Sequence, residues 1–281
     1  MSQSDSNPSA DLLERSLALK AFPPLASLDE RVLASLAQHA RTRRLAPGER
    51  LTTTHPAPRA LRLVVSGELR DELRGATFTK HQLVGGPHAL ALRADKTRLR
   101  AESEVVLLEL EDRKLDALFE DEFSVLEAML RGLGRVILQQ GTVYLDLAAE
   151  PTVGTLGLIE RVQLLSSCPE LASLGIDILA DLGLEGERIR IPRGGSLRLQ
   201  GAEQYAILLQ GSLTDAAETT LGPTCLFGWL EALAEVTDPR RYLARSPSEV
   251  MSFEAERFWD RLEDYPERGL RLVRVLARRV E

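Results

Sequence analysis

The sequence predicts a mainly β protein made of two tandem antiparallel β-rolls, which are jelly-roll-like, with α-helices flanking each roll. Three observations predict this fold class. Short segments of alternating apolar and polar residues end at glycine turns, helical apolar spacing is found before and after these segments, and the whole pattern recurs about 140 to 146 residues further along. Many short strands between end helices are typical of small antiparallel barrels and rolls.

Composition and charge narrow the class of protein. The chain has 281 residues, 44% hydrophobic and 27% charged, which suits a globular protein with room for two domains. The formal net charge of −7 repels nucleic acid and anionic membranes. The N-terminus lacks a basic, then apolar, leader, and no segment approaches the ~18 consecutive apolar residues of a membrane span. We therefore expect a cytoplasmic protein with neither nucleic acid nor membrane as a partner.

The two copies begin with similar helical patterns. In "LASLDERVLASLAQHA", Ser27 and Glu30 stand in an S-x-x-E relation before helically spaced apolar residues. Ser167 and Glu170 stand in the same relation in "LLSSCPELASLGIDILADL". This spacing predicts a capping box at the start of a helix in each copy.

The strand regions and the closing helices repeat as well. "LAPGERL" and "LVVSGEL" turn at Gly48 and Gly67, while "RIRIPRGGSLRL" and "YAILLQGSLTD" turn at Gly194 and Gly211. One or two helices close each copy, and the break falls near "LAAEPTVGT". The predicted organisation is a disordered tail over 1–10, a first domain over 11–147 and a second domain over 156–281.

On these residues the chain resembles the cyclic-nucleotide-binding domain family, the sensory β-roll of the catabolite activator protein and of cyclic-nucleotide-regulated kinases and channels. The resemblance is carried by "LAPGERL" and "LVVSGEL" in the first half and by "FGWL" and "PRRYLARS" in the second, and it covers nearly the whole chain, twice over. It implies a roll of about eight strands in each half. It also implies a phosphate-binding cassette between the sixth and seventh strands of each roll.

In this family a glutamate in F-G-E-L binds the ribose hydroxyl and an arginine in P-R-x-A binds the cyclic phosphate, as expected from charge-assisted hydrogen bonding. In the second half Trp229 stands at the glutamate position, whereas Arg240 keeps the arginine position. The candidate ligand-binding residues, vestigial or repurposed, are Gly228, Trp229, Leu230, Arg240, Arg241 and Tyr242. In the first half the same register gives His88 and Asp95, a degenerate site.

These substitutions change what each cassette can bind. Asp95 would set a negative charge against a phosphate, which costs about 4 kcal/mol at ~4 Å and an effective dielectric of ~20. Loss of the glutamate at Trp229 removes a hydrogen bond worth about 1.5–3 kcal/mol. Two interpretations of Trp229 stay open. Either the indole fills a pocket that has stopped binding, or it stacks on a purine or another flat ligand while Arg240 holds a phosphate.

Catalytic and metal-binding motifs are missing from the sequence. The four histidines, His39, His55, His81 and His88, form no H-x-H or H-x-x-x-H pair, so no metal site is expected. No G-x-S-x-G, Walker loop or G-x-G-x-x-G occurs, and no helix-turn-helix follows the closing helix. We expect no enzyme and no required cofactor, a cyclic nucleotide being the one possible ligand.

Two hypotheses follow. In the first, a non-enzymatic bacterial regulatory or scaffold protein uses two degenerate cyclic-nucleotide-binding-like domains to contact partner proteins of unknown identity. In the second, a cytoplasmic sensor binds a cyclic nucleotide or a related phosphorylated ligand through Arg240 in the second domain. The arginine-rich closing helix, "PERGLRLVRVLARRVE", suits either its own helix dipole or contact with a partner, and a homodimer through the closing helices is possible.

Overall fold

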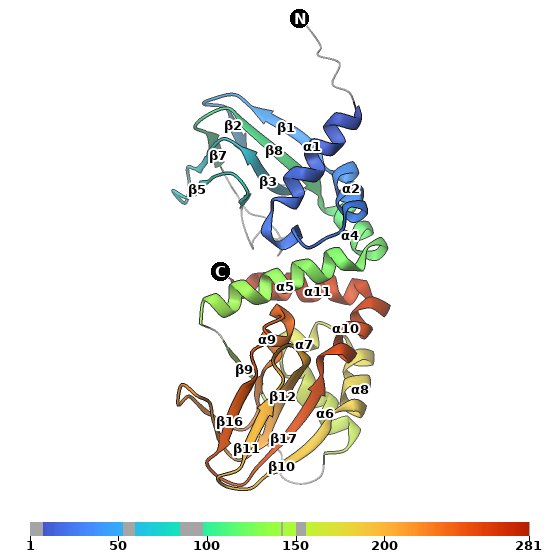
Figure 1. Ribbon diagram of the computed structural model, residues 1–281, viewed down its shortest axis with the longest axis vertical. Helices are drawn as coiled ribbons and strands as arrows, with labels where there is room; N and C mark the ends of the chain where they lie inside the picture. The colour runs from blue at the N-terminus through green and yellow to red at the C-terminus, as the bar shows by residue number, and fades with distance from the viewer. Residues whose placement is uncertain (1–7, 53–59, 85–97, 142, 150–155, 281) are drawn as a thin grey trace, which may run out of the picture. The chain divides into compact units, whose positions relative to one another are not determined.

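The computed structural model describes residues 8–52, 60–84, 98–141, 143–149 and 156–280. The chain folds into two compact units, Met1–Met129 and Leu130–Val280, and each contains antiparallel sheets with flanking helices (Figure 1). The predicted fold class, two tandem antiparallel β-rolls, is confirmed. Residues 130–147, which the sequence places at the end of the first domain, are part of the second unit.

The first unit holds two four-stranded sheets, of order β1-β8-β3-β6 and β2-β7-β4-β5. Its strands are β1 (Arg41–Leu45), β2 (Arg50–Thr52), β3 (Ala60–Ser66), β4 (Leu69–Asp71), β5 (Thr77–Phe78), β6 (Leu83–Val84), β7 (Arg98–Ala101) and β8 (Val105–Glu111). Its helical elements are α1 (Pro8–Lys20), η1 (Pro23–Leu25), α2 (Glu30–His39), α4 (Asp112–Asp121) and the start of α5 (Phe123–Gln139). Helix α1 begins at Pro8, within the stretch predicted to be a disordered tail.

The second unit repeats this plan, with sheets of order β10-β17-β12-β15-β9 and β11-β16-β13-β14. Its strands are β9 (Tyr144–Asp146), β10 (Glu187–Ile191), β11 (Ser196–Leu199), β12 (Gln204–Gln210), β13 (Leu213–Thr214), β14 (Thr220–Leu221), β15 (Cys225–Phe227), β16 (Arg240–Ala244) and β17 (Ser248–Glu254). Its helices are the end of α5, α6 (Leu158–Ser166), α7 (Pro169–Ala172), α8 (Ile176–Glu185), η2 (Gly201–Glu203), α9 (Trp229–Ala234), α10 (Ala255–Asp264) and α11 (Pro266–Arg279). Strand β9 has no predicted counterpart, because it lies where the sequence indicates the end of the first domain.

The duplication predicted from the sequence extends to irregular details of the strands. The β3–β8 register shifts between Val64 and Ser66, and the β12–β17 register shifts between Leu208 and Gln210. A glycine with positive φ follows each shift, Gly67 in the first unit and Gly211 in the second. A Cβ at Gly67 would collide with the carbonyl oxygen of Glu104, and a Cβ at Gly211 with that of Pro247. The turn therefore requires glycine in both copies.

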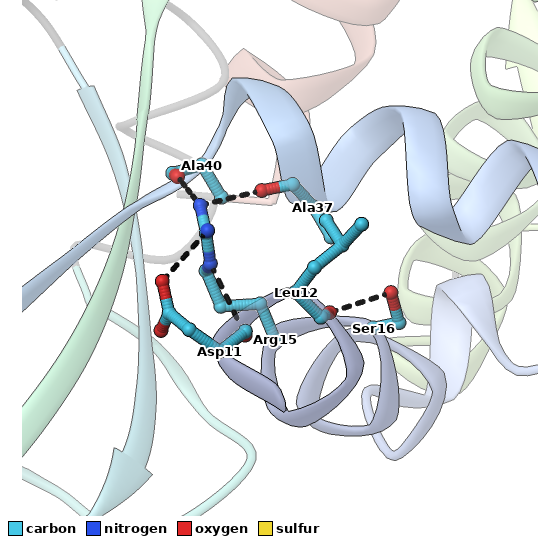
Figure 2. Close-up of polar contacts among 6 residues, drawn as sticks. All are labelled: Asp11, Leu12, Arg15, Ser16, Ala37 and Ala40. Atoms are coloured by element: carbon cyan, nitrogen blue, oxygen red, sulfur yellow. Dashed lines mark hydrogen bonds and ion pairs between the residues drawn. The ribbon is translucent and has the colours of Figure 1, made fainter. Parts of the chain in front are cut away.

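The side chain of Arg15 links helices α1 and α2 of the first unit by hydrogen bonds (Figure 2). The Arg15 guanidinium on α1 donates to the carbonyls of Ala37 and Ala40 at 2.8 and 2.6 Å, at the end of α2. It also pairs with the Asp11 carboxylate at 2.8 Å. Carbonyls at a helix end have no intrahelical donor, so this side chain supplies the missing partners.

The second unit uses the same device. The Arg161 guanidinium on α6 donates to the carbonyls of Gly183 and Gly186, at the end of α8, at 2.8 and 3.1 Å. Arg161 also donates to the carbonyl of Leu156. The α1–α2 and α6–α8 pairs are therefore equivalent elements of the repeat.

The predicted capping boxes are wrong in both copies. Helix α2 is capped by Asp29, whose carboxylate accepts from the Val32 amide at 2.9 Å, because its first residue is Glu30 and Ser27 lies too far upstream. In the second copy Pro169 starts the short helix α7, and the Glu170 side chain is buried, accepting from the Cys168 thiol.

Each roll has an apolar interior of its own. That of the first unit gathers Leu45, Leu51, Val64, Leu69, Val84, Leu99, Ala101, Val105 and Leu107. That of the second gathers Ile191, Leu197, Leu199, Ala206, Leu208, Leu213, Leu221, Cys225, Phe227, Tyr242, Ala244 and Val250. In the parts of the chain that the structure describes, no helix is both long and apolar enough to cross a bilayer.

Candidate functional site

The candidate cassette of the second unit is formed by β15, α9 and β16. Gly228 makes the turn from β15 into α9 with φ of 78°. A Cβ there would meet the Leu199 side chain at 2.8 Å and the Gln204 carbonyl at 3.0 Å. The glycine is thus required by backbone geometry and close packing, whether or not a ligand binds.

The indole of Trp229 lies in the core of the unit. Its side chain is 1% exposed and meets the ring of Phe258 on α10 edge-on, with the centroids 6.1 Å apart. The next residue, Leu230, is equally buried. Trp229 therefore joins α9 to α10, and its burial leaves no open face for a purine to stack on.

Glu231, on the same short helix, lies beside the arginine of the cassette. Its side chain is fully buried, and one carboxylate oxygen is 3.7 Å from Nη2 of Arg240. Neither oxygen has a hydrogen-bond partner among the described residues. Burial raises the pKa of Glu231 above its ordinary value, and the positive charge of Arg240 opposes this rise. The guanidinium that would bind a phosphate thus already faces a buried carboxyl group of its own cassette.

Tyr242 fills the interior of the roll directly after the two arginines of β16. It is fully buried and packs edge-on against Phe227 with the ring centroids 4.7 Å apart. Its hydroxyl has no hydrogen-bond partner within the described part of the chain. Burial, and then the nearby charge of Glu231, raise the pKa of this phenol. Two aromatic rings therefore occupy the space between the sheets beside the cassette.

Tyr144 comes to the same region from the start of the second unit. Strand β9 pairs with β15, Tyr144 opposite Phe227, and the Tyr144 hydroxyl donates to the Asp215 carboxylate. Asp215 also accepts from the amides of Ala217 and Thr219 at 2.9 and 2.7 Å. Partial burial opposes ionisation of Asp215, but these hydrogen bonds outweigh it and lower the pKa. Burial, and then the bond to Asp215, raise the pKa of Tyr144.

The predicted site residues thus separate into two groups. Gly228, Trp229, Leu230 and Tyr242 are buried and belong to the turn or the core. Arg240 and Arg241 are exposed, and of these two Arg240 meets Glu231. His88 and Asp95, the predicted remnants of a first site, lie outside the described residues.

Sequence reasoning missed Glu231 and Tyr144. Glu231 had a visible signal, because it is the one charged residue among the apolar ones of "WLEALA". A carboxylate inside an otherwise apolar helix is expected either to find a partner or to bind something. Tyr144 had no such signal, since its position depends on pairing between strands about 80 residues apart.

The two cysteines do not form a second candidate site. Cys168 and Cys225 are free and buried, and burial raises the pKa of each thiol to about 12. A thiol with such a pKa is not a nucleophile near neutral pH. In the part of the chain that the structure describes, no group of three or more His, Cys, Asp or Glu side chains has the arrangement of a metal site.

Comparison with known proteins gives no match to a family model and no match among curated proteins. Several solved structures are similar. The regulatory domain of Toxoplasma gondii protein kinase A with cAMP is 15% identical, with 93% of this chain and 97% of that chain covered and a TM-score of 0.37. The regulatory subunit of a cAMP-independent protein kinase A from Trypanosoma cruzi, bound to guanosine, is 13% identical over 92% of this chain and 84% of that chain, with a TM-score of 0.35.

A single-domain structure is similar to part of the chain. The N-terminal domain of a transcriptional regulator from Streptomyces coelicolor is 24% identical, with 44% of this chain and 92% of that chain covered and a TM-score of 0.38. The chain is similar to these structures in fold, in keeping with its resemblance to cyclic-nucleotide-binding-like domains. At these identities and scores the likeness carries no information about a ligand of this chain.

Proposed function

We propose that this chain is a non-enzymatic regulatory protein whose second β-roll keeps the framework of a cyclic-nucleotide-binding domain but does not bind the nucleotide. An internal ion pair takes the place of the ligand phosphate, and the protein acts by contacting other proteins.

The Glu231–Arg240 pair is the observation that carries this proposal. A buried carboxylate 3.7 Å from the guanidinium supplies the negative charge that a cyclic phosphate would bring. An incoming phosphate would have to displace that carboxylate or lie against it, and like charges at such distances repel. Phe227 and Tyr242 fill the neighbouring interior, so a nucleotide would also have to displace packed rings.

A sensor is the second candidate, and one observation favours it. Both Glu231 oxygens and the Tyr242 hydroxyl are buried without a hydrogen-bond partner among the described residues. Unsatisfied buried polar atoms are costly and are often met by a ligand or by water. The ribose of a cyclic nucleotide has one free hydroxyl, at the 2′ position, which has the chemistry to donate to a Glu231 oxygen while Arg240 holds the cyclic phosphate.

Titration calorimetry of the wild-type chain with cAMP and with cGMP separates the two candidates. The proposal predicts no saturable heat and no change in melting temperature. A bound nucleotide at ~100 times its Kd would add about 2.7 kcal/mol to the folded state, several degrees for a domain of this size.

The test variant is Arg240→Gln, which removes the charge of the cassette. The matched control is Arg257→Gln, which removes one charge from an exposed position on α10. Saturable binding that is lost in Arg240→Gln and retained in Arg257→Gln would establish the sensor and overturn the proposal.

A further inference from the structure

The outer face of the sheet β11-β16-β13-β14 in the second unit carries a pair of arginines that the cassette does not use. Along β11 and β16 burial alternates, with Leu197, Leu199 and Tyr242 facing the interior. Arg198 and Arg241 lie on the opposite, exposed face and are direct partners across the two strands. Two like charges therefore stand side by side on neighbouring strands, an arrangement that destabilises a sheet.

Neither arginine has a carboxylate partner among the residues that the structure describes. Strands β11 and β16 both lie in the continuously described range 156–280. Within this range Arg198 and Arg241 make no ion pair and no side-chain hydrogen bond. The other sheet of this unit differs, because there Arg190 stands opposite Glu249 and pairs with it at 3.8 Å. The positive charge on the β11–β16 face is therefore uncompensated in a chain of net charge −7.

The two arginines line a hollow. An open depression of about 390 Å³ is bounded by Ser196, Arg198, Pro239 and Arg241. Two guanidinium groups offer several N–H donors in fixed forks, and the Ser196 hydroxyl adds a further donor at the same place. This is the donor set for a compact anion with several oxygens.

We propose that this hollow binds the phosphate monoester of a phosphorylated side chain on a partner protein, with Arg198 and Arg241 as the two anchoring residues. A phosphate monoester carries a charge of about −1.5 to −2 and three acceptor oxygens, so it can meet both arginines at once. A single carboxylate carries one charge and would leave one arginine uncompensated. The inference rests on the proposed function only in taking a protein segment as the occupant.

A protein segment fits the surface better than a nucleic acid does. A nucleic acid is bound by many phosphate contacts along a track, and this site offers two arginines on an acidic protein. The hollow is also open to solvent at the sheet surface, which suits a side chain presented by a peptide. It lies outside the roll interior that a cyclic nucleotide would enter.

The test is fluorescence anisotropy of the full chain with a labelled peptide pool that carries a central phosphoserine flanked by mixed residues. The same pool with serine in place of phosphoserine is the matched probe, and unlabelled inorganic phosphate, O-phosphoserine and cAMP are the competitors. The variants are Arg198→Ala/Arg241→Ala and, with the same change of charge, Arg257→Ala/Arg271→Ala on exposed positions of α10 and α11.

We expect the phosphorylated pool to bind at least tenfold more tightly than the unphosphorylated pool. Arg198→Ala/Arg241→Ala should lose at least tenfold in affinity, while Arg257→Ala/Arg271→Ala keeps it. Equal binding of the two pools, equal loss in the two double variants, or inorganic phosphate or O-phosphoserine competing as tightly as the peptides bind would overturn the proposal. Displacement by cAMP would place the anion in the cassette and overturn both this proposal and the proposed function, whereas failed peptide binding leaves the latter intact.

Discussion

At the scale of single residues, the most informative group is the buried carboxylate of Glu231. Its pKa in the folded protein lies above the ordinary value of 4.5, because burial disfavours its charge. The folded state therefore holds this proton more strongly than the unfolded state does, and the stability that comes with the proton is lost as the pH rises through the folded pKa.

The first prediction follows from the raised pKa of Glu231. Relative to Glu231→Gln, the free energy of unfolding of the wild type should fall as the pH rises above about 4.5, by at most about 1.4 kcal/mol per pH unit within the window between the two pKa values. Urea unfolding of both proteins at several pH values measures the difference. Wild-type stability that stays constant relative to Glu231→Gln, or that rises relative to it with pH, would mean that burial does not raise the pKa of Glu231.

The second prediction compares two tyrosines of the same region. The Tyr242 hydroxyl is buried without a partner among the described residues, so Tyr242→Phe should leave stability unchanged or raise it. The Tyr144 hydroxyl donates to the charged Asp215, so Tyr144→Phe should lower stability by about 1–2 kcal/mol. Denaturant titration of the two variants checks the order. If Tyr242→Phe costs more than Tyr144→Phe, Tyr242 has a partner, for example a bound water.

At the scale of elements, the glycine turns carry much of the repeat. Gly194 and Gly211 both have positive φ, but a Cβ at Gly194 meets nothing within 4 Å, whereas at Gly211 it runs into Pro247 and Ser248. The third prediction is that Gly194→Ala costs about 1–2 kcal/mol from backbone conformation alone. Gly211→Ala should cost about 1–3 kcal/mol more, because backbone has to move. Thermal unfolding of the pair tests this, and equal losses would show that the close approach at Gly211 is easily relieved.

Some of these elements can be predicted from the sequence and others cannot. Strands and glycine turns depend on local alternation and on single residues, so the two rolls and their repeat were predictable. The start of α2 was misplaced because Ser27 and Asp29 are both suitable N-cap residues, and the structure uses Asp29. The pairing of β9 with β15 and the place of α5 depend on contacts between distant segments, which no local pattern reports.

The candidate site was predicted less well than the fold. The turn at Gly228 and the charge at Arg240 follow from local motifs. The Glu231–Arg240 pair does not, because it depends on which way a six-residue helix turns its side chains. Trp229 stands at a motif position, yet its indole packs on α10 from later in the chain.

At the level of the whole molecule, the two units have separate cores, and only the second unit contains tryptophan and tyrosine. Both tryptophans and all four tyrosines, Trp229, Trp259, Tyr144, Tyr205, Tyr242 and Tyr265, lie in the second unit. The fourth prediction is that urea curves followed by tryptophan fluorescence and by far-ultraviolet circular dichroism do not coincide, since the first signal reports one unit and the second reports both. Coincident curves would show that the units unfold as one cooperative body.

A double-mutant cycle measures whether the internal carboxylate of Glu231 holds Arg240 of the cassette. Unfolding of the wild type, Glu231→Gln, Arg240→Gln and the double variant is followed at pH 7 by tryptophan fluorescence, which reports the unit that contains the pair. We predict a favourable coupling energy of about 1 kcal/mol or more, within the range found for residues that interact directly. Additivity of the two single changes to within about 0.5 kcal/mol would show that Glu231 does not hold Arg240, which would then be free to hold a ligand.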